Sequence, residues 1–240
     1  MTEDPSELAV PPYARVRRPG DLAADLGALN IPIRRPVLVS VGGAGGMAPE
    51  YLAATATVLE RVVLGMDRWG AVVVDGGTDS GVMRVMGRVR KAVGARFPLV
   101  GVVAEGTVSL PGTSAAPGAA TLEPHHTHVV LVPGNAWGDE SPWLSCVATV
   151  IADGQPSLTL VVNGGEITYE DIDHSVSAAR PVIVLAGTGR TADAIAAAAD
   201  GHGEDRRAAQ VAASRGTQIV PRGDPQAAYS AIESILAPRG

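Results

Sequence analysis

The sequence predicts an α/β protein with a doubly wound, mostly parallel sheet and helices on both faces. Five short runs rich in Val, Leu and Ile each end in a glycine turn, and stretches with helical periodicity separate these runs. Runs of this kind are typical of parallel strands that are buried on both faces. Because ligands of such sheets bind outside the carboxyl ends of the strands, the glycines also indicate where a ligand would lie.

The length and composition indicate one globular domain. The chain has 240 residues, of which 46% are hydrophobic and 18% charged, so it can bury a substantial core. We expect residues 1–34 to be a lead-in segment, partly mobile, and residues 35–240 to form a single domain.

The charge and cysteine content limit the possible partners and location. The net charge of −6 argues against a nucleic-acid binder, although 18 of the 19 cationic residues are Arg, which suits phosphate and carboxylate. Cys146 is the only cysteine, so no intrachain disulfide can form, and no metal-ligand spacing is present. Since no CxxC or Cys/His spacing is found, we expect no metal. We expect a soluble cytoplasmic protein with no membrane span, because neither a signal peptide nor a long apolar run is found.

Strands are predicted where short apolar runs lie between turn residues. They span Val37–Val41, Ala71–Val74, Leu99–Ala104, Thr127–Val132, Leu158–Val162, Pro181–Leu185 and Gln218–Val220. The long segment Glu105–Pro124, rich in Pro, Gly, Ser and Ala, is expected to be a loop over the crevice.

Helices are predicted where apolar residues recur at helical spacing. They span Asp21–Leu29, Glu50–Met66, Ser80–Val93, Ser141–Ala152, Tyr169–Ala179, Thr191–Ala199 and Asp224–Leu236. Ser141 and Asp224 are expected to be N-caps, because each directly precedes a proline that suits the first helical position. The polar segment Gly201–Arg207 is expected to be mobile.

The turn from Asp75 to Met83 is the first candidate site. It contains Gly76, Gly77 and Gly81 together with Thr78, Asp79 and Ser80, and it lies between a strand and a helix. Helix N-terminal amides and two hydroxyls at such a turn suit a phosphate. A tight turn in which Asp79 or Ser80 caps the helix is the alternative.

The first glycine turn, Gly42-Gly-Ala-Gly-Gly46, is less specific. It lacks the full spacing of a dinucleotide fingerprint and the lysine of a Walker loop. It is consistent with either a ligand loop or a plain turn.

The turn from Pro133 to Trp143 contains two of the three tryptophans. Trp137 could stack on a base, whereas Trp143 is expected to pack on the helix. Glu140 could bind ribose hydroxyls or act as an acid or base, and Asp139 or Ser141 could cap the helix.

Arg190 follows Gly187, Thr188 and Gly189 at the start of a helix, where it could bind a phosphate or remain a surface arginine. Asp193 could pair with Arg190 or cap the helix. The turn at Gly164 suggests no role beyond ending a strand.

His125, His126 and His128 lie close together in the sequence. On a strand only His126 and His128 would face the same side, and no third ligand is spaced near these two for a metal. We expect a structural histidine or a hydrogen bond to the ligand.

Several segments together resemble the SLOG superfamily, in particular its LSDAT branch. These segments are Val39–Gly43, Asp75–Met83, His126–His128 and Pro181–Asp193, and the resemblance extends from about Arg35 to Ala199. The branch includes the cytosolic N-terminal homology region of melastatin-type TRP channels and free-standing prokaryotic relatives.

The resemblance implies a Rossmann-like domain that binds a nucleotide-derived signal such as ADP-ribose, a cyclic relative or a nucleoside monophosphate. It also implies a homo-oligomer, either a dimer or a tetramer, and no required cofactor. On this basis the candidate ligand-binding residues are Gly42, Gly43, Gly45, Gly76, Gly77, Thr78, Asp79, Ser80, Gly81, Glu105, His126, Asn135, Trp137, Gly138, Gly187, Thr188, Gly189 and Arg190.

The same superfamily includes the Lonely Guy phosphoribohydrolases, whose hallmark is Pro-Gly-Gly-x-Gly-Thr-x-x-Glu. The corresponding stretch here, Pro133 to Ser141, departs from that hallmark at the second glycine and at the Gly-Thr pair, and Glu140 lies one residue early. A nucleotide-cleaving enzyme with Glu140 as the catalytic residue is therefore the alternative to a sensor-type binding domain. An unliganded structural module is the third interpretation.

Overall fold

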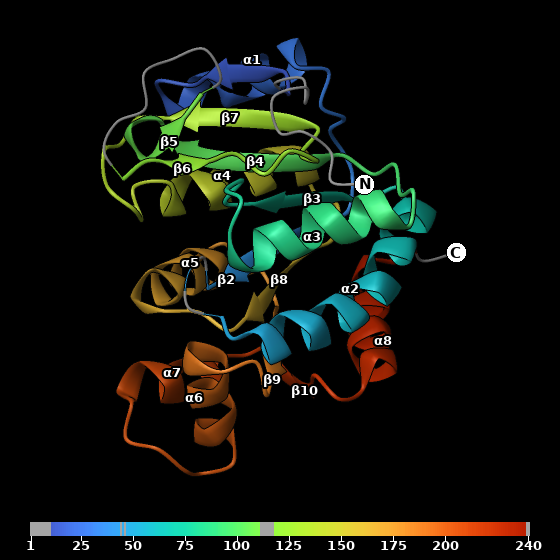
Figure 1. The fold of residues 1–240 in the computed structure, drawn as a ribbon, viewed down its shortest axis with the longest axis vertical. Coiled ribbons are helices and arrows are strands. Elements are labelled where there is room, and N and C mark those ends of the chain that lie inside the picture. The colour runs from blue at the N-terminus through green and yellow to red at the C-terminus, as the bar shows by residue number, and fades with distance from the viewer. Residues whose placement is uncertain (1–10, 44, 46, 111–117, 239–240) are drawn as a thin grey trace.

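An eight-stranded sheet runs through the molecule, with helices on both faces (Figure 1). The computed structural model describes residues 11–43, 45, 47–110 and 118–238. Along the sheet the strand order is β1-β7-β4-β3-β2-β8-β9-β10, and each described neighbouring pair is parallel. The predicted doubly wound α/β fold is confirmed.

The strands lie close to their predicted positions. They are β1 (Tyr13–Arg15), β2 (Val37–Gly42), β3 (Val72–Asp75), β4 (Leu99–Ala104), β7 (His128–Val132), β8 (Ser157–Val162), β9 (Val182–Ala186) and β10 (Thr217–Pro221). Because side chains alternate along a strand, β2 places Val37, Val39 and Val41 in one core and Leu38 in the other. This two-sided burial explains the continuous apolar runs.

The helices form two layers. They are α1 (Leu22–Ala28), α2 (Pro49–Trp69), α3 (Gly81–Ala92), α4 (Ser141–Ala152), α5 (Glu166–Ser177), α6 (Arg190–Ala199), α7 (Arg206–Ala213) and α8 (Pro225–Leu236). Helices α2, α3 and α8 pack in one core, and the other five pack in the core on the opposite face. In Figure 1, α3 lies in front of the sheet and α4 behind it.

The strand order places a switch point at β2. From β2 the chain proceeds through β3, β4 and β7 in one direction, and it then returns to β8 on the other side of β2. Connections that diverge in this way leave a crevice at the carboxyl ends of the two central strands, where ligands of open α/β sheets bind.

The described part of the lead-in, from residue 11 on, belongs to the folded structure. Strand β1 pairs with β7 at the edge of the sheet, and Leu22 and Leu26 of α1 are buried. Arg15 and Arg17 pair with Glu105 at 2.6 and 2.8 Å. The short, polar sequence of β1 gave no strand signal, because this strand depends on pairing with its neighbour.

Some helix boundaries differ from the prediction. Helix α5 begins at Glu166 rather than at Tyr169, and Ser141 is the first residue of α4 rather than its N-cap. Helix α7 begins inside the segment expected to be mobile, where the Asp205 carboxylate accepts hydrogen bonds from Arg207 N and Ala208 N. The expected cap at Asp224 is confirmed by its hydrogen bond from Ala227 N at 2.9 Å.

The segment predicted as a loop over the crevice contains short elements. A 3-10 turn (Glu105–Thr107) leads into β5 (Val108–Ser109), which pairs with β6 (Ala120–Thr121). Residues 111–117 lie outside the described part. The returning chain lies against the Gly76–Ser80 turn, since Asp79 N donates to Thr121 O at 2.8 Å.

Glycines allow close contacts beneath this turn. A Cβ on Gly77 would lie 2.9 Å from Gly101 Cα of β4, and Gly77 also has a φ of +64°. In α3, a Cβ on Gly87 would overlap the buried carboxyl group of Glu123. These glycines therefore have packing roles.

Replacing Gly87 with alanine should destabilise the protein by about 1–3 kcal/mol, because the added methyl group must displace Glu123. Urea unfolding followed by circular dichroism measures this change. Gly27 of α1 is the matched helical control, since a Cβ there meets nothing within 4 Å. Gly27→Ala should leave stability unchanged or raise it by up to about 1 kcal/mol, and equal losses in the two variants would contradict this account.

Candidate functional site

A cavity of about 590 Å³ lies at the carboxyl ends of β2 and β3, next to the starts of α3, α4, α5 and α6. This volume is in the range of small-molecule sites. Nine predicted site residues line it: Gly42, Gly43, Gly45, Gly76, Thr78, Ser80, Trp137, Glu140 and Arg190. The other residues of its wall are Ser40, Val41, Met83, Ala120, Leu144, Gly165, Glu166, Ile167, Thr168 and Asp171.

The end of β2 forms part of the cavity wall. Gly42 has a φ of +155°, and a Cβ there would overlap the carbonyl group of Val162 in β8. Gly43 N donates to the same carbonyl at 3.2 Å, and Gly43 O accepts from Val82 N of α3 at 3.3 Å. The first glycine turn therefore allows close contact of β2 with β8 and α3; Ala44 and Gly46 lie outside the described residues.

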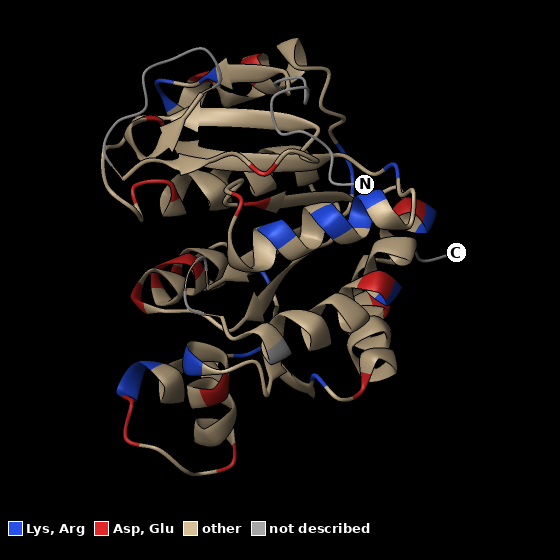
Figure 2. Cartoon of the chain, viewed as in Figure 1, with Lys and Arg blue, Asp and Glu red and all other residues tan. Residues whose placement is uncertain are grey.

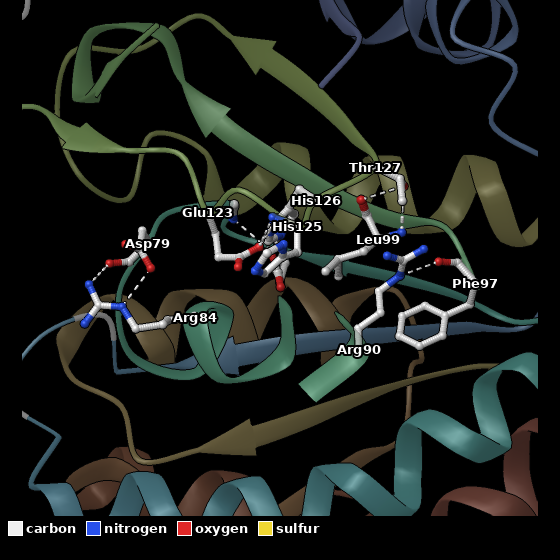
Figure 3. Close-up of polar contacts among 11 residues, drawn as sticks. Asp79, Arg84, Arg90, Phe97, Leu99, Glu123, His125, His126 and Thr127 are labelled. Atoms are coloured by element: carbon white, nitrogen blue, oxygen red, sulfur yellow. Dashed lines mark hydrogen bonds and ion pairs between the residues drawn. The ribbon is translucent and has the colours of Figure 1, made fainter. Parts of the chain in front are cut away.

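The Gly76–Ser80 turn directs two hydroxyl groups to the cavity. The hydroxyl oxygens of Thr78 and Ser80 lie 3.0 Å apart, and both residues line the wall. Asp79 instead turns toward Arg84, with 2.7 Å between its Oδ1 and Arg84 Nε (Figure 3). Gly77 and Gly81, like Asp79, do not line the cavity.

The turn before α4 contributes an aromatic ring and a carboxyl group. Trp137 is 46% exposed although it lines the cavity. Asp139 closes the turn by accepting from Ala136 N and Asn135 N, and these hydrogen bonds lower its pKa. Glu140 accepts from Gly138 N at 3.0 Å, but burial outweighs this hydrogen bond and raises the pKa of Glu140. Asn135 and Gly138 are not part of the wall.

Arg190 begins α6 at the edge of the cavity. Its Nη1 donates to Gly45 O at 3.4 Å, and a Cβ on Gly165 would lie 2.8 Å from its Nη2. Glycine at position 165 therefore leaves room for the guanidinium group. The φ of Arg190 is +53°, in a region that L-residues rarely adopt, so the turn holds this residue at a conformational cost.

The rest of the Gly187–Gly189 turn is bonded internally and does not line the cavity. The buried Thr188 hydroxyl donates to Leu185 O at 2.6 Å and accepts from Asn163 N at 2.8 Å. Gly187 N donates to Asp193 at 2.6 Å. These hydrogen bonds connect the turns after β8 and β9, and they support Arg190 on the side away from the cavity.

The sequence analysis underestimated the turn after β8. Gly165, Glu166, Ile167 and Thr168 all line the cavity as α5 begins. Asp171, one helical turn after Ile167, lines it too, and burial raises its pKa to about 7. The available signal was the spacing of Ile167 and Asp171, since residues four apart share one helix face.

Two further predicted site residues, Glu105 and His126, also lie away from the cavity wall. Glu105 pairs with Arg15 and Arg17 of the lead-in, and the hydrogen bond from Arg15 is the main cause of its lowered pKa. His126 is buried between two carboxylates, with Nε2 2.7 Å from Asp75 and Nδ1 2.9 Å from Glu123 (Figure 3). His126 therefore contacts two carboxylates rather than the cavity, as expected for a structural histidine.

The ionisation of His126 follows from its neighbours. Burial alone would lower its pKa, but the Asp75 carboxylate and the hydrogen bonds to Asp75 and Glu123 raise it from 6.5 to about 10. The imidazolium ion therefore lies between Asp75, at the end of β3, and Glu123, on the returning segment. This ion chain stabilises the Gly76–Ser80 turn, because Asp75 and Glu123 both form hydrogen bonds with the backbone of Gly77.

None of the described helices combines the length and apolar character needed to cross a membrane. Among the same described residues, no group of three or more His, Cys, Asp or Glu side chains is arranged to hold a metal ion.

The fold and cavity define a doubly wound α/β protein with a ligand-sized site at the switch point of its sheet. The chain belongs to the family described as "SLOG in TRPM, prokaryote", whose model matches residues 35–229, and the predicted resemblance is thereby confirmed. No curated protein matches the sequence.

Two solved structures share the fold. The first, reported as the X-ray structure of TM1055, is 21% identical with a TM-score of 0.53, and the match covers 84% of this chain and 99% of that chain. The second, a molybdenum cofactor binding protein from the phototrophic bacterium Rippkaea orientalis, is 14% identical with a TM-score of 0.54 and coverages of 84% and 97%. At these identities the likeness shows the fold alone.

Protonated His126 should make stability depend on pH. Because its pKa is raised from 6.5 to about 10 on folding, the stabilisation is complete below pH 6.5 and is lost as the pH rises through about 10. Urea unfolding between pH 6.5 and 9.5 should show this decline. His126→Gln should lose stability by about 3–5 kcal/mol at neutral pH and remove most of the slope.

His125→Gln is the control, because its ring has no carboxylate contact comparable to that of His126 in the described structure. This variant should keep the wild-type slope. Equal slopes in wild type and His126→Gln would show that His126 is neutral in the folded protein.

Proposed function

We propose that this chain is a sensor-type nucleotide-binding domain. Its ligand is an ADP-ribose-like molecule, a cyclic relative or a nucleoside monophosphate, held at the carboxyl ends of the strands without a required cofactor. The observation that carries the proposal is the convergence of Arg190, Trp137 and the starts of α3 and α5 on one cavity.

The phosphate group is assigned to the side of the cavity with Arg190. Helices α3 and α5 both direct their N-terminal turns at the cavity, where the amides and helix dipoles favour an anion. Thr78 and Ser80 add hydroxyl donors. The guanidinium group of Arg190 supplies the positive charge and can form two parallel hydrogen bonds to a phosphate.

A buried hydroxyl also supports a bound ligand. Ser40 lines the cavity and is only 1% exposed, yet its Oγ has no hydrogen-bond partner in the described structure. Buried polar atoms are rarely left without a partner, so a ligand group or water would satisfy this one.

The base is assigned to the apolar part of the wall. Trp137 offers an exposed ring for stacking, and Met83, Leu144 and Ile167 supply apolar contacts. Stacking of a base on an aromatic ring contributes about 1–3 kcal/mol.

N-glycosidic cleavage is the second candidate function, and the position of Glu140 favours it. This carboxyl lines the cavity, and burial raises its pKa, as expected for an acid or base that works near neutral pH. In this reaction water would replace the base at the ribose carbon, with Glu140 transferring the proton. The products would be the free base and ribose phosphate.

A nucleotide panel separates the two functions. The wild-type protein is mixed with ADP-ribose, cyclic ADP-ribose and the nucleoside monophosphates, and unfolding temperature and product release are measured. A thermal shift without product supports a binder, and release of free base supports the enzyme. No shift and no product with any nucleotide would overturn both.

We also propose that the protein forms a homo-oligomer, either a dimer or a tetramer, because the resemblance implies one. Light scattering on the purified protein with and without nucleotide tests this proposal. A monomer under both conditions would overturn it.

Arg190→Gln should weaken nucleotide binding about 10- to 100-fold, because a charge-assisted hydrogen bond to phosphate is lost. Titration calorimetry measures the affinity. Arg88→Gln is the matched control, since Arg88 is exposed on α3 and does not line the cavity. Equal affinities of Arg190→Gln and wild type would contradict the proposal that Arg190 binds the phosphate.

A further inference from the structure

The cavity carries opposite charges on two parts of its wall. Arg190 provides a cation where it contacts Gly45, and its charge also acts on Glu166 at the start of α5. The carboxyl groups of Glu140 and Asp171 line another part of the same cavity, where α4 and α5 pack together. Figure 2 shows acidic residues along α5. A ligand that fills the cavity therefore needs an anionic group for one part and a hydrogen-bond donor for the other.

The acidic part of the wall is poorly solvated. Leu144 and Ile167 lie beside the two carboxyl groups in the cavity wall. Burial is the main cause of the raised pKa of both Glu140 and Asp171, and each is also affected by the charge of Glu170. The Ser141 hydroxyl opposes this shift at Asp171. A phosphate would be repelled here, whereas an N–H donor could form a further hydrogen bond to a carboxyl oxygen.

We propose that Asp171, together with Glu140, binds the exocyclic amino group of a nucleobase and so determines which base the site accepts. This proposal rests on the proposed nucleotide-binding function and deepens it. Each carboxylate oxygen accepts an N–H hydrogen bond, and an amino group offers two such donors. A base that lacks the amino group leaves the half-buried carboxylate without this additional hydrogen bond. Sites built around such a hydrogen bond reject ligands that lack it.

Two pairs of nucleotides test the proposal, because each pair differs by one amino group. GMP is compared with IMP, and AMP with purine riboside 5′-monophosphate, by titration calorimetry at pH 8. For the base that the site accepts, we expect the amino form to bind at least about tenfold more tightly. Equal affinities within both pairs, with binding intact, would overturn the proposal while leaving the proposed function in place.

Asp171→Leu replaces the carboxyl group with an apolar group of the same branched shape, and it should abolish the preference for the amino form. Asp173→Leu is the matched control, because Asp173 is exposed on the same helix and does not line the cavity. Ribose 5-phosphate binding, through Arg190, shows whether each variant still folds with an intact phosphate site. Loss of the amino preference in both variants, or in neither, would overturn the role of Asp171.

The pH dependence supplies a second readout. The ionised carboxylate is the stronger acceptor, so the ratio of the two affinities in a pair should increase as the pH rises from 6 to 8. The charged groups that act on Glu140 and Asp171, besides each other, are Asp139 and Glu170. Glu166 and Arg190 line the same cavity. Phosphate ionisation affects both members of a pair and cancels in the ratio.

Asp171→Asn keeps one acceptor oxygen but cannot ionise. It should retain part of the amino preference and lose most of the change with pH. A ratio that changes equally with pH in wild type and Asp171→Asn would assign the effect to another group. If no nucleotide or ribose 5-phosphate binds the wild-type protein, the proposed function and this proposal both fail.

Discussion

The buried ion chain of Asp75, His126 and Glu123 is the constraint on which the candidate site depends. Asp75 ends β3, and its Oδ1 accepts from both His126 Nε2 and Gly77 N. His126 connects it to Glu123, whose own N donates to Gly77 O at 2.9 Å. One cluster thus fixes the peptide groups on both sides of Gly77, directly before Thr78. Buried ion pairs add little net stability, but removing one partner is costly, so this cluster chiefly favours one arrangement of the turn.

The sequence contained enough information for the sheet and for much of the site. Apolar runs between glycines identified the main strands, because burial on both faces demands such runs. The sequence did not identify β1, because this strand depends on pairing with β7, which is distant in sequence. It also did not identify the start of α7, because the Asp205 cap lies in a polar segment that was interpreted as mobile. Asp171 was missed because an acidic residue on a helix is expected to be exposed to solvent. Only the packing of α4 against α5 shows that it lines the cavity. Glycines were also ambiguous, because Gly77 and Gly87 serve packing whereas Gly76 lines the cavity.

The glycine-ended strands contribute to the site in unequal ways. The turn after β3 supplies hydroxyl groups, and the turn after β7 supplies Trp137 and Glu140. The turn after β9 contributes through Arg190, while its own backbone is bonded to Asn163 and Asp193. Rigid turns of this kind hold charged groups in place before a ligand arrives, which reduces the entropy lost on binding.

The two outer strands affect how copies of this chain could meet. Strand β1 has only three residues and ends in Arg15, and Arg17 and Arg18 follow after Val16. Strand β10 ends in Pro221, which has no N–H to donate. Edge strands that are short, charged or contain proline resist pairing with a further strand. Assembly of this protein would therefore use helix surfaces rather than a sheet continued from one subunit to the next, so the strands would remain within each subunit.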